Sequence, residues 1–149
     1  MKRLIEVPWG EVMAGKGEVV LNSNTDNECL VIAAYDAVKK IGCLAHAVFS
    51  DSKKLHRSCL SVMRNLTDAI DEMIKDMMML GADQDDIEVA LVAGENIPHA
   101  KDDPGYNGRI NYVMEILAQR RIKCRSDRIC DIGSSHVGLD VSSGKILFQ

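Results

Sequence analysis

Residues 26–49, DNECLVIAAYDAVKKIGCLAHAVF, contain the pattern that decides the fold. Two continuous apolar runs, at 29–35 and 41–49, flank the short polar segment DAVKK. Apolar runs of this length, bounded by turn-forming residues, are typical of strands that are buried on both faces of a sheet. The stretch therefore predicts a β-hairpin, with Cys29 at the start of its first strand and His46 inside its second.

The alternation of side chains along a strand limits how Cys29 and His46 can meet. If Tyr35 pairs with Lys40, Cys29 lies directly opposite His46, with Cβ atoms about 4.5–5.5 Å apart. If Tyr35 pairs with Gly42, the two residues are diagonal neighbours about 7–8 Å apart. Both registers place the two side chains on one face of the hairpin, whereas a shift of one residue would separate them.

A thiol beside an imidazole has a specific chemistry. The imidazole takes the thiol proton and leaves a thiolate, which is the nucleophile, and the imidazolium then protonates a leaving group. Such a pair suits acyl transfer from amides or esters. The pattern of the strands alone also allows Cys29 and His46 to be ordinary core residues, as Cys43 on the opposite face is expected to be.

The remaining periodicity predicts two helices and further strands. An apolar stripe every three or four residues predicts an amphipathic helix from about His56 to Leu80, which Gly81 would end. A second helix is expected at 109–121. Strands are expected near 17–22, after a shorter one, and at 86–94, 122–126, 136–141 and 145–148. Segregated strands with two helices predict an α+β fold, with the helices packed on a mixed or antiparallel sheet.

Length and charge narrow the class of protein. The 149 residues suit a single domain spanning 1–149. The net charge of −4 and the lack of a basic stripe predict no nucleic-acid binding. Apolar runs are too short for a membrane span, and Glu6 and Pro8 interrupt any signal sequence, so we expect a cytoplasmic protein.

The cysteines predict neither disulfides nor a metal site. Their number, five, is odd, and no signal sequence precedes them. The spacing His56-x-x-Cys59 is a weak metal-binding signal because no second pair of ligands accompanies it. We expect no metal or organic cofactor.

Taken in order, these features resemble the CheD family of chemoreceptor glutamine deamidases. Cys29 falls where that family has its nucleophile, and His46 falls on its catalytic histidine. Ser23 matches the family's site threonine on a gapless count, and Thr25 matches it if the loop shifts. The segments that carry the resemblance are IGCLAHAVFSDS (41–52), VALVAGENI (89–97), NGRINYVMEILAQRRIK (107–123) and SSGKILF (142–148).

The chain departs from the family pattern just before the candidate nucleophile. Asn27-Glu28 replaces the family's Gly-Ser, and a Glu28 charge facing the sulfur would oppose formation of a thiolate. Ser50 stands where the family has a proline after the histidine. These departures bear on activity rather than on the fold.

The resemblance implies a function and two alternatives. As a family member, the protein would deamidate glutamines in the cytoplasmic domain of chemoreceptors and would bind a CheC-type phosphatase. The first alternative is a non-catalytic CheD-like module that binds and regulates the CheC-type phosphatase. The second is a cysteine deamidase with another protein target, because the fold also resembles the catalytic domain of cytotoxic necrotizing factors.

Overall fold

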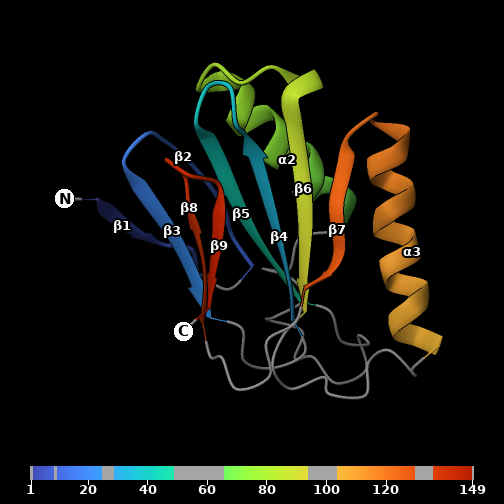
Figure 1. Ribbon diagram of the computed structural model, residues 1–149. Helices are drawn as coiled ribbons and strands as arrows, with labels where there is room; N and C mark the ends of the chain where they lie inside the picture. Colours follow the sequence, from blue (N-terminus) through green and yellow to red (C-terminus); the bar gives the residue numbers. More distant parts are fainter. Residues whose placement is uncertain are drawn as a thin grey trace.

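A computed structural model describes residues 2–8, 10–24, 29–48, 66–93, 104–129 and 136–148. Figure 1 shows two β-sheets with helices on one side. In chain order the elements are β1 (Arg3–Glu6), β2 (Val12–Lys16), β3 (Val19–Asn24), β4 (Cys29–Asp36), β5 (Ile41–Val48), α2 (Leu66–Met79), the 3₁₀ turn η2 (Gln84–Asp86), β6 (Ile87–Ala93), α3 (Pro104–Gln119), β7 (Lys123–Ile129), β8 (His136–Asp140) and β9 (Lys145–Phe148).

The strands form two sheets that face each other. One sheet has the order β1-β3-β8-β9 and the other has the order β2-β5-β4-β6-β7. The β1–β3 and β6–β7 pairs are parallel, and the other pairs are antiparallel. Helix α2 packs on β2 and β5, and α3 packs beside β7 (Figure 1). The predicted α+β class, with two helices on mixed sheets, is confirmed.

Two clusters of buried side chains explain why β4 and β5 are apolar on both faces. An inter-sheet cluster lies between the two sheets and includes Leu21, Val31, Leu44 and Leu139. A helix-side cluster fills the space between the five-stranded sheet and the helices, and its members from the hairpin include Ile32, Ala34, Cys43 and Ala45. Successive residues of the hairpin therefore enter different clusters, which removes the polar alternation of a half-exposed strand.

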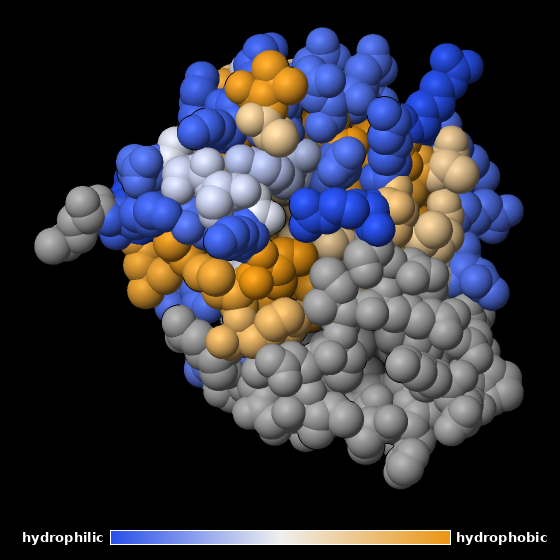
Figure 2. Space-filling model, viewed as in Figure 1, coloured by the Kyte–Doolittle hydropathy of each residue, from blue (hydrophilic) through white to orange (hydrophobic). Residues whose placement is uncertain are grey.

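The outer face of the four-stranded sheet is not covered by any described helix, unlike the outer face of the five-stranded sheet (Figure 1). Leu4 on β1 is 60% exposed there. Figure 2 shows hydrophobic surface gathered over this sheet, close to the end of the sandwich where β3 finishes. Polar contacts also lie on this face, such as the hydrogen bond from the Asn22 amide to the Glu6 carboxylate at 3.1 Å.

The β4–β5 hairpin has the second of the two registers that place Cys29 and His46 on one face. Tyr35 pairs with Gly42 and Asp36 pairs with Ile41. The Asp36 carboxylate fixes this turn, because its Oδ1 accepts hydrogen bonds from the amides of Val38 and Lys39 at 3.0 and 3.1 Å. A side chain that caps the turn in this way makes Asp36 the last strand residue rather than the first loop residue.

Helix α2 ends as its sequence predicts. Gly81 adopts a φ of 110°, its amide bonds to the Met78 carbonyl, and the Ala82 amide bonds to the Met77 carbonyl at 3.0 Å. This is the double hydrogen bond of a Schellman motif, which favours glycine at that position. The predicted stripe is buried at Ile70, Met73, Ile74 and Met77, whereas Leu80 is 38% exposed because it follows the last helical turn. Residues 56–65 of the predicted helix lie outside the described part of the chain.

Helix α3 begins at Pro104, earlier than the predicted start at residue 109. Proline suits the first turn of a helix because its missing N–H would have no partner there and its φ is already helical. Val113, Ile116 and Leu117 are buried against the sheet. Within the described residues, no helix is both long enough and apolar enough to cross a membrane.

Candidate active site

The predicted site residues lie at one end of the sandwich. Ser23 is next to the last residue of β3, Cys29 is the first residue of β4, and His46 is near the end of β5. The ends of β6 and β7 and the start of β8 gather at the same end, at the bottom of Figure 1. Strands from both sheets therefore bring distant parts of the chain together there.

Cys29 and His46 occupy diagonal positions on one face of the hairpin. The ladder pairs Cys29 with Val48 and pairs Val31 with His46. Because alternate residues share a face, position 29 has the same orientation as Val31, which lies directly opposite His46. Diagonal positions of this kind are about 7–8 Å apart, within reach of a long or aromatic side chain. The side chain of Cys29 lies outside the described part of the structure.

His46 is buried between the two sheets. It is 3% exposed and shares its strand face with Leu44, which belongs to the inter-sheet cluster. Its backbone amide donates a hydrogen bond to the Glu11 carbonyl at 2.9 Å. Burial disfavours the protonated imidazolium unless a negative charge lies close by, so the groups beside His46 decide its proton affinity.

Ser23 faces the same space from the opposite sheet. It is fully buried, it pairs with Val137 of β8, and it shares its strand face with Leu21 of the inter-sheet cluster. Its hydroxyl donates a hydrogen bond to the Val7 carbonyl at 2.9 Å. Since that bond uses the one hydroxyl hydrogen, the Ser23 oxygen can act toward other groups only as an acceptor. Thr25, the alternative to Ser23, lies outside the described residues, as does Glu28.

Cys43 lies on the other face of the hairpin and is a core residue. It is fully buried in the helix-side cluster. Burial raises the pKa of the Cys43 thiol well above its ordinary value, and the nearby Asp76 and Glu72 carboxylates raise it further. A thiol held neutral in this way is a poor nucleophile. Cys124 is partly buried, and Cys59 and Cys130 lie outside the described residues.

The other histidines and the metal-binding residue types add little to the site. His136 pairs with Asn24 across β3 and β8, and its position alternates with Val137, which points into the inter-sheet cluster. His136 is therefore directed to the outer face of its sheet. Within the described residues, no three His, Cys, Asp or Glu side chains gather as metal ligands. His56 and His99 lie outside that part of the chain.

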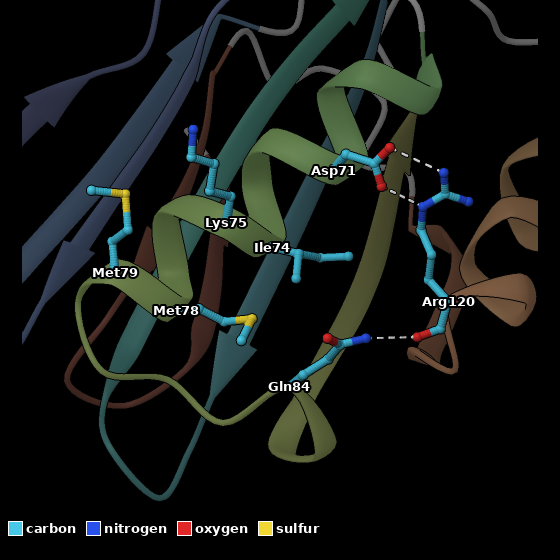
Figure 3. Close-up of a pocket in the computed structure, with 7 residues that line it drawn as sticks. All are labelled: Asp71, Ile74, Lys75, Met78, Met79, Gln84 and Arg120. Atoms are coloured by element: carbon cyan, nitrogen blue, oxygen red, sulfur yellow. Dashed lines mark hydrogen bonds and ion pairs between the residues drawn. The ribbon is translucent and has the colours of Figure 1, made fainter.

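A surface cavity of about 490 Å³ lies away from these residues, where the second half of α2 meets η2 and the end of α3. Figure 3 shows the Asp71–Arg120 ion pair at one side of it, and Gln84 donates a hydrogen bond to the Arg120 carbonyl at 2.9 Å. The cavity is lined by Asp71, Ile74, Lys75, Met78, Met79, Gln84 and Arg120. No thiol, hydroxyl or imidazole is among them, so we do not assign the chemistry to this cavity.

Sequence reasoning missed Glu11, which the structure places beside His46. Strand β2 pairs with β5, although 24 residues separate Lys16 from Ile41 and no hairpin joins the two strands. Pairing between strands that are distant in sequence leaves no local signal. The one available signal was the short apolar run of β2, VMA at 12–14, which indicates a strand but not its neighbour.

Comparison with known proteins supports a single family. No protein-family model matches the chain. A Pyrococcus abyssi protein is 28% identical over 98% of this chain and 91% of its own length. A Thermococcus kodakarensis protein is 26% identical over 95% of this chain and 89% of its own length. A Chlorobium luteolum protein is 26% identical over 78% of this chain and 58% of its own length. All three are named "Probable chemoreceptor glutamine deamidase CheD".

These similarities extend over most of the chain, and they agree with the order of motifs that the sequence itself presents. The identities of 24–28% also agree with the departures from the family pattern around residues 27 and 28. Over most of its length the chain is therefore similar to proteins named as CheD, with identities of 24–28%.

Proposed function

We propose that the protein is a cysteine-dependent glutamine deamidase that acts on the cytoplasmic domain of chemoreceptors. The observation that carries this proposal is the β4–β5 register, in which Cys29 and His46 are diagonal neighbours on one face. The names of the relatives support the activity and the class of substrate. Action on the cytoplasmic part of a receptor also implies that the protein works in the cytoplasm.

The reaction that we propose consumes water and releases ammonia. His46 takes the proton of the Cys29 thiol, and the thiolate sulfur attacks the carboxamide carbon of a receptor glutamine. The C–N bond then breaks while the imidazolium protonates the departing nitrogen, which leaves as ammonia. The acyl group remains on the Cys29 sulfur as a thioester. His46 next deprotonates a water that attacks the thioester, the C–S bond breaks, and the product is a glutamate side chain. No step requires a metal or organic cofactor.

Ser23 takes part in this proposal as an acceptor. Its hydroxyl hydrogen is bound to the Val7 carbonyl, so the oxygen can receive a hydrogen from His46 or from the attacking water. Either contact would hold its partner in one orientation. Ser23 would act through another group and not on the substrate itself.

Mass spectrometry of receptor cytoplasmic domains tests the proposal directly. After incubation with the protein, selected glutamines should gain the mass of a Gln→Glu conversion. The Cys29→Ala and His46→Gln variants should lose this activity. Cys43→Ala is the matched control, because it removes a thiol of the same hairpin from the opposite face. Equal loss in Cys29→Ala and Cys43→Ala, or no conversion by the unaltered protein, would overturn the proposal.

Asn27-Glu28 favours a second candidate function, because it replaces the family's pattern beside the nucleophile with a negative charge. A protein that lost its thiolate could still bind a CheC-type phosphatase and regulate it. Calorimetric titration of the protein with such a phosphatase distinguishes the two functions. Binding by an unaltered protein that converts no glutamine would favour this second candidate. Deamidation of non-receptor proteins alone would instead favour a cysteine deamidase with another target.

A further inference from the structure

Glu11 immediately precedes β2, the edge strand of the five-stranded sheet, and lies beside His46 of β5. The β2–β5 ladder pairs Val12 with Ala45 and Met13 with Leu44. One further step in the same register brings Glu11 opposite His46. The hydrogen bond of 2.9 Å from the His46 amide to the Glu11 carbonyl shows that the pairing continues to this step.

The alternation of the two strands directs both side chains to the same space. Val12 packs against the helix-side cluster, as Ala45 does, whereas Met13 packs against the inter-sheet cluster with Leu44. Position 11 alternates with Val12 and so has the orientation of Met13. Directly opposed residues in an antiparallel pair have Cβ atoms about 4.5–5.5 Å apart. A glutamate side chain spans that separation easily.

His46 therefore has a different neighbour on each side. On β4 it faces apolar Val31 directly and Cys29 diagonally. The facing sheet presents Leu21 and Ser23 to the same space, and neither of these carries a charge.

Among the described residues of the four-stranded sheet, three other titratable side chains are directed away from His46. Glu6 is bound to Asn22 on the outer face of the four-stranded sheet, and the position of His136 is directed to the same outer face. Asp140 lies at the far end of β8, where it is bound to Lys2. Among the described residues that surround His46, Glu11 is thus the carboxylate that the register brings to it.

We propose that Glu11 is a positioning residue for His46: its carboxylate holds the imidazole ring in one orientation and balances the positive charge that the ring gains when it takes the Cys29 proton. A carboxylate beside a histidine does both in many active sites, where it fixes the tautomer and stabilises the imidazolium. Glu11 is only partly buried, whereas His46 is 3% exposed, so water can hydrate a charge on the imidazole ring only poorly. The inference rests on the proposed function in one respect, the role of His46 as the base.

An NMR titration of the histidine ring protons tests this inference without any substrate. The His46 signal is assigned by its loss in His46→Gln. In Glu11→Gln, which keeps the size of the side chain and removes its charge, the His46 pKa should fall by about one unit or more. Glu11→Asp retains the charge and should restore most of the shift. Glu88→Gln is the matched control, because Glu88 is an exposed glutamate of the same sheet, near the end of β4 that is remote from Cys29, and it should leave the His46 pKa unchanged.

A second measurement follows the consequence for the thiol. The rate at which an alkylating reagent modifies Cys29, measured against pH, should shift to higher pH in Glu11→Gln and not in Glu88→Gln. A purely structural role for Glu11 would change thermal stability but neither pH profile. An unchanged His46 pKa in folded Glu11→Gln would overturn the inference, whether or not activity falls.

The two proposals fail in different experiments. If the unaltered protein converts no receptor glutamine, the proposed function is wrong, while the His46 titration still decides the role of Glu11. If the unaltered protein is active and Glu11→Gln moves neither the His46 pKa nor the Cys29 profile, the proposed function stands and the role of Glu11 is wrong.

Discussion

The carboxylate of Asp36 accepts a hydrogen bond from the backbone amide of Asp83 at 3.0 Å, which ties the β4–β5 turn to the connection between α2 and β6. The same carboxylate also accepts the amides of Val38 and Lys39, and Asp36 is fully buried. A buried carboxylate with three backbone donors is a structural anchor, because its removal would leave those donors without partners.

Asp36→Ala should therefore lower the free energy of unfolding by about 3–5 kcal/mol, since an uncompensated cluster of buried polar groups remains. Asp36→Asn keeps one oxygen acceptor but turns an NH₂ group toward one of the amides, so a smaller loss is expected. Chemical denaturation of the three proteins measures both changes. Equal losses in the two variants would mean that the hydrogen bonds to Asp36 are not what stabilises the turn.

Gly144 and Gly17 are a matched pair of positions that separates the effect of side-chain packing from the effect of backbone strain. Their φ angles are 77° and 78°, so alanine is strained equally at both. A Cβ at Gly144 would lie 2.6 Å from Cδ2 of the Tyr35 ring, whereas a Cβ at Gly17 would meet nothing within 4 Å.

Gly17→Ala should cost about 1 kcal/mol of stability from backbone strain alone. Gly144→Ala should cost about 1–3 kcal/mol more, because the Tyr35 ring must move. Urea denaturation of both variants gives the difference. If they lose the same stability, the contact between Tyr35 and the Gly144 turn does not constrain the packing of the sheets.

The two cysteines of the hairpin should differ in reactivity. We expect a thiol-selective reagent to modify Cys29 in the folded protein at a pH below about 8.5, the ordinary thiol pKa, because His46 favours the thiolate. Cys43 should react only when the protein unfolds, because it is fully buried and its pKa is raised. Peptide mapping by mass spectrometry after short exposures identifies the modified thiol. Equal and slow modification of all five cysteines would contradict an activated Cys29.

Acid should weaken the contact between the N-terminus and β8. The hydrogen bond from the Lys2 ammonium, at 2.6 Å, holds the pKa of Asp140 below its usual range, and Ser142 acts in the same direction. Because the folded pKa is lower than the unfolded value of about 3.9, this stabilisation is complete above that pH and is lost as the pH falls through the folded value.

Lys2→Met should therefore move the acid-unfolding midpoint to a higher pH, while Lys75→Met, on the exposed face of α2, should leave it in place. Circular dichroism during an acid titration follows both variants. An unshifted midpoint in Lys2→Met would show that the pairing of Lys2 with Asp140 does not contribute to acid stability.

The sequence predicted those parts of the fold that depend on neighbouring residues. The hairpin, the buried stripe of α2 and the stop at Gly81 follow from local periodicity and from the freedom of glycine at positive φ. The start of α3 was misjudged because the polar residues around Pro104 looked like a loop.

Long-range contacts were harder to predict. The alternation of side chains along the strands left two hairpin registers open. The choice between them depends on the hydrogen bonds that Asp36 accepts from Val38, Lys39 and the distant Asp83. Glu11 was missed for the same reason, because its relation to His46 exists only after β2 pairs with β5. The site residues that the resemblance named remain predictions until the activity is measured.

The fixed turns of this protein stand at one end of the sandwich, and the candidate site stands at the other. Asp36 and Gly144 form the strand turns at the far end and Gly81 ends α2 there, through bonds and contacts that involve none of Ser23, Cys29 and His46. Substitutions in the segments that join the strands near the site can therefore accumulate without shifting the register. Such an arrangement explains how identities of only 24–28% can accompany a similarity that extends over most of the chain.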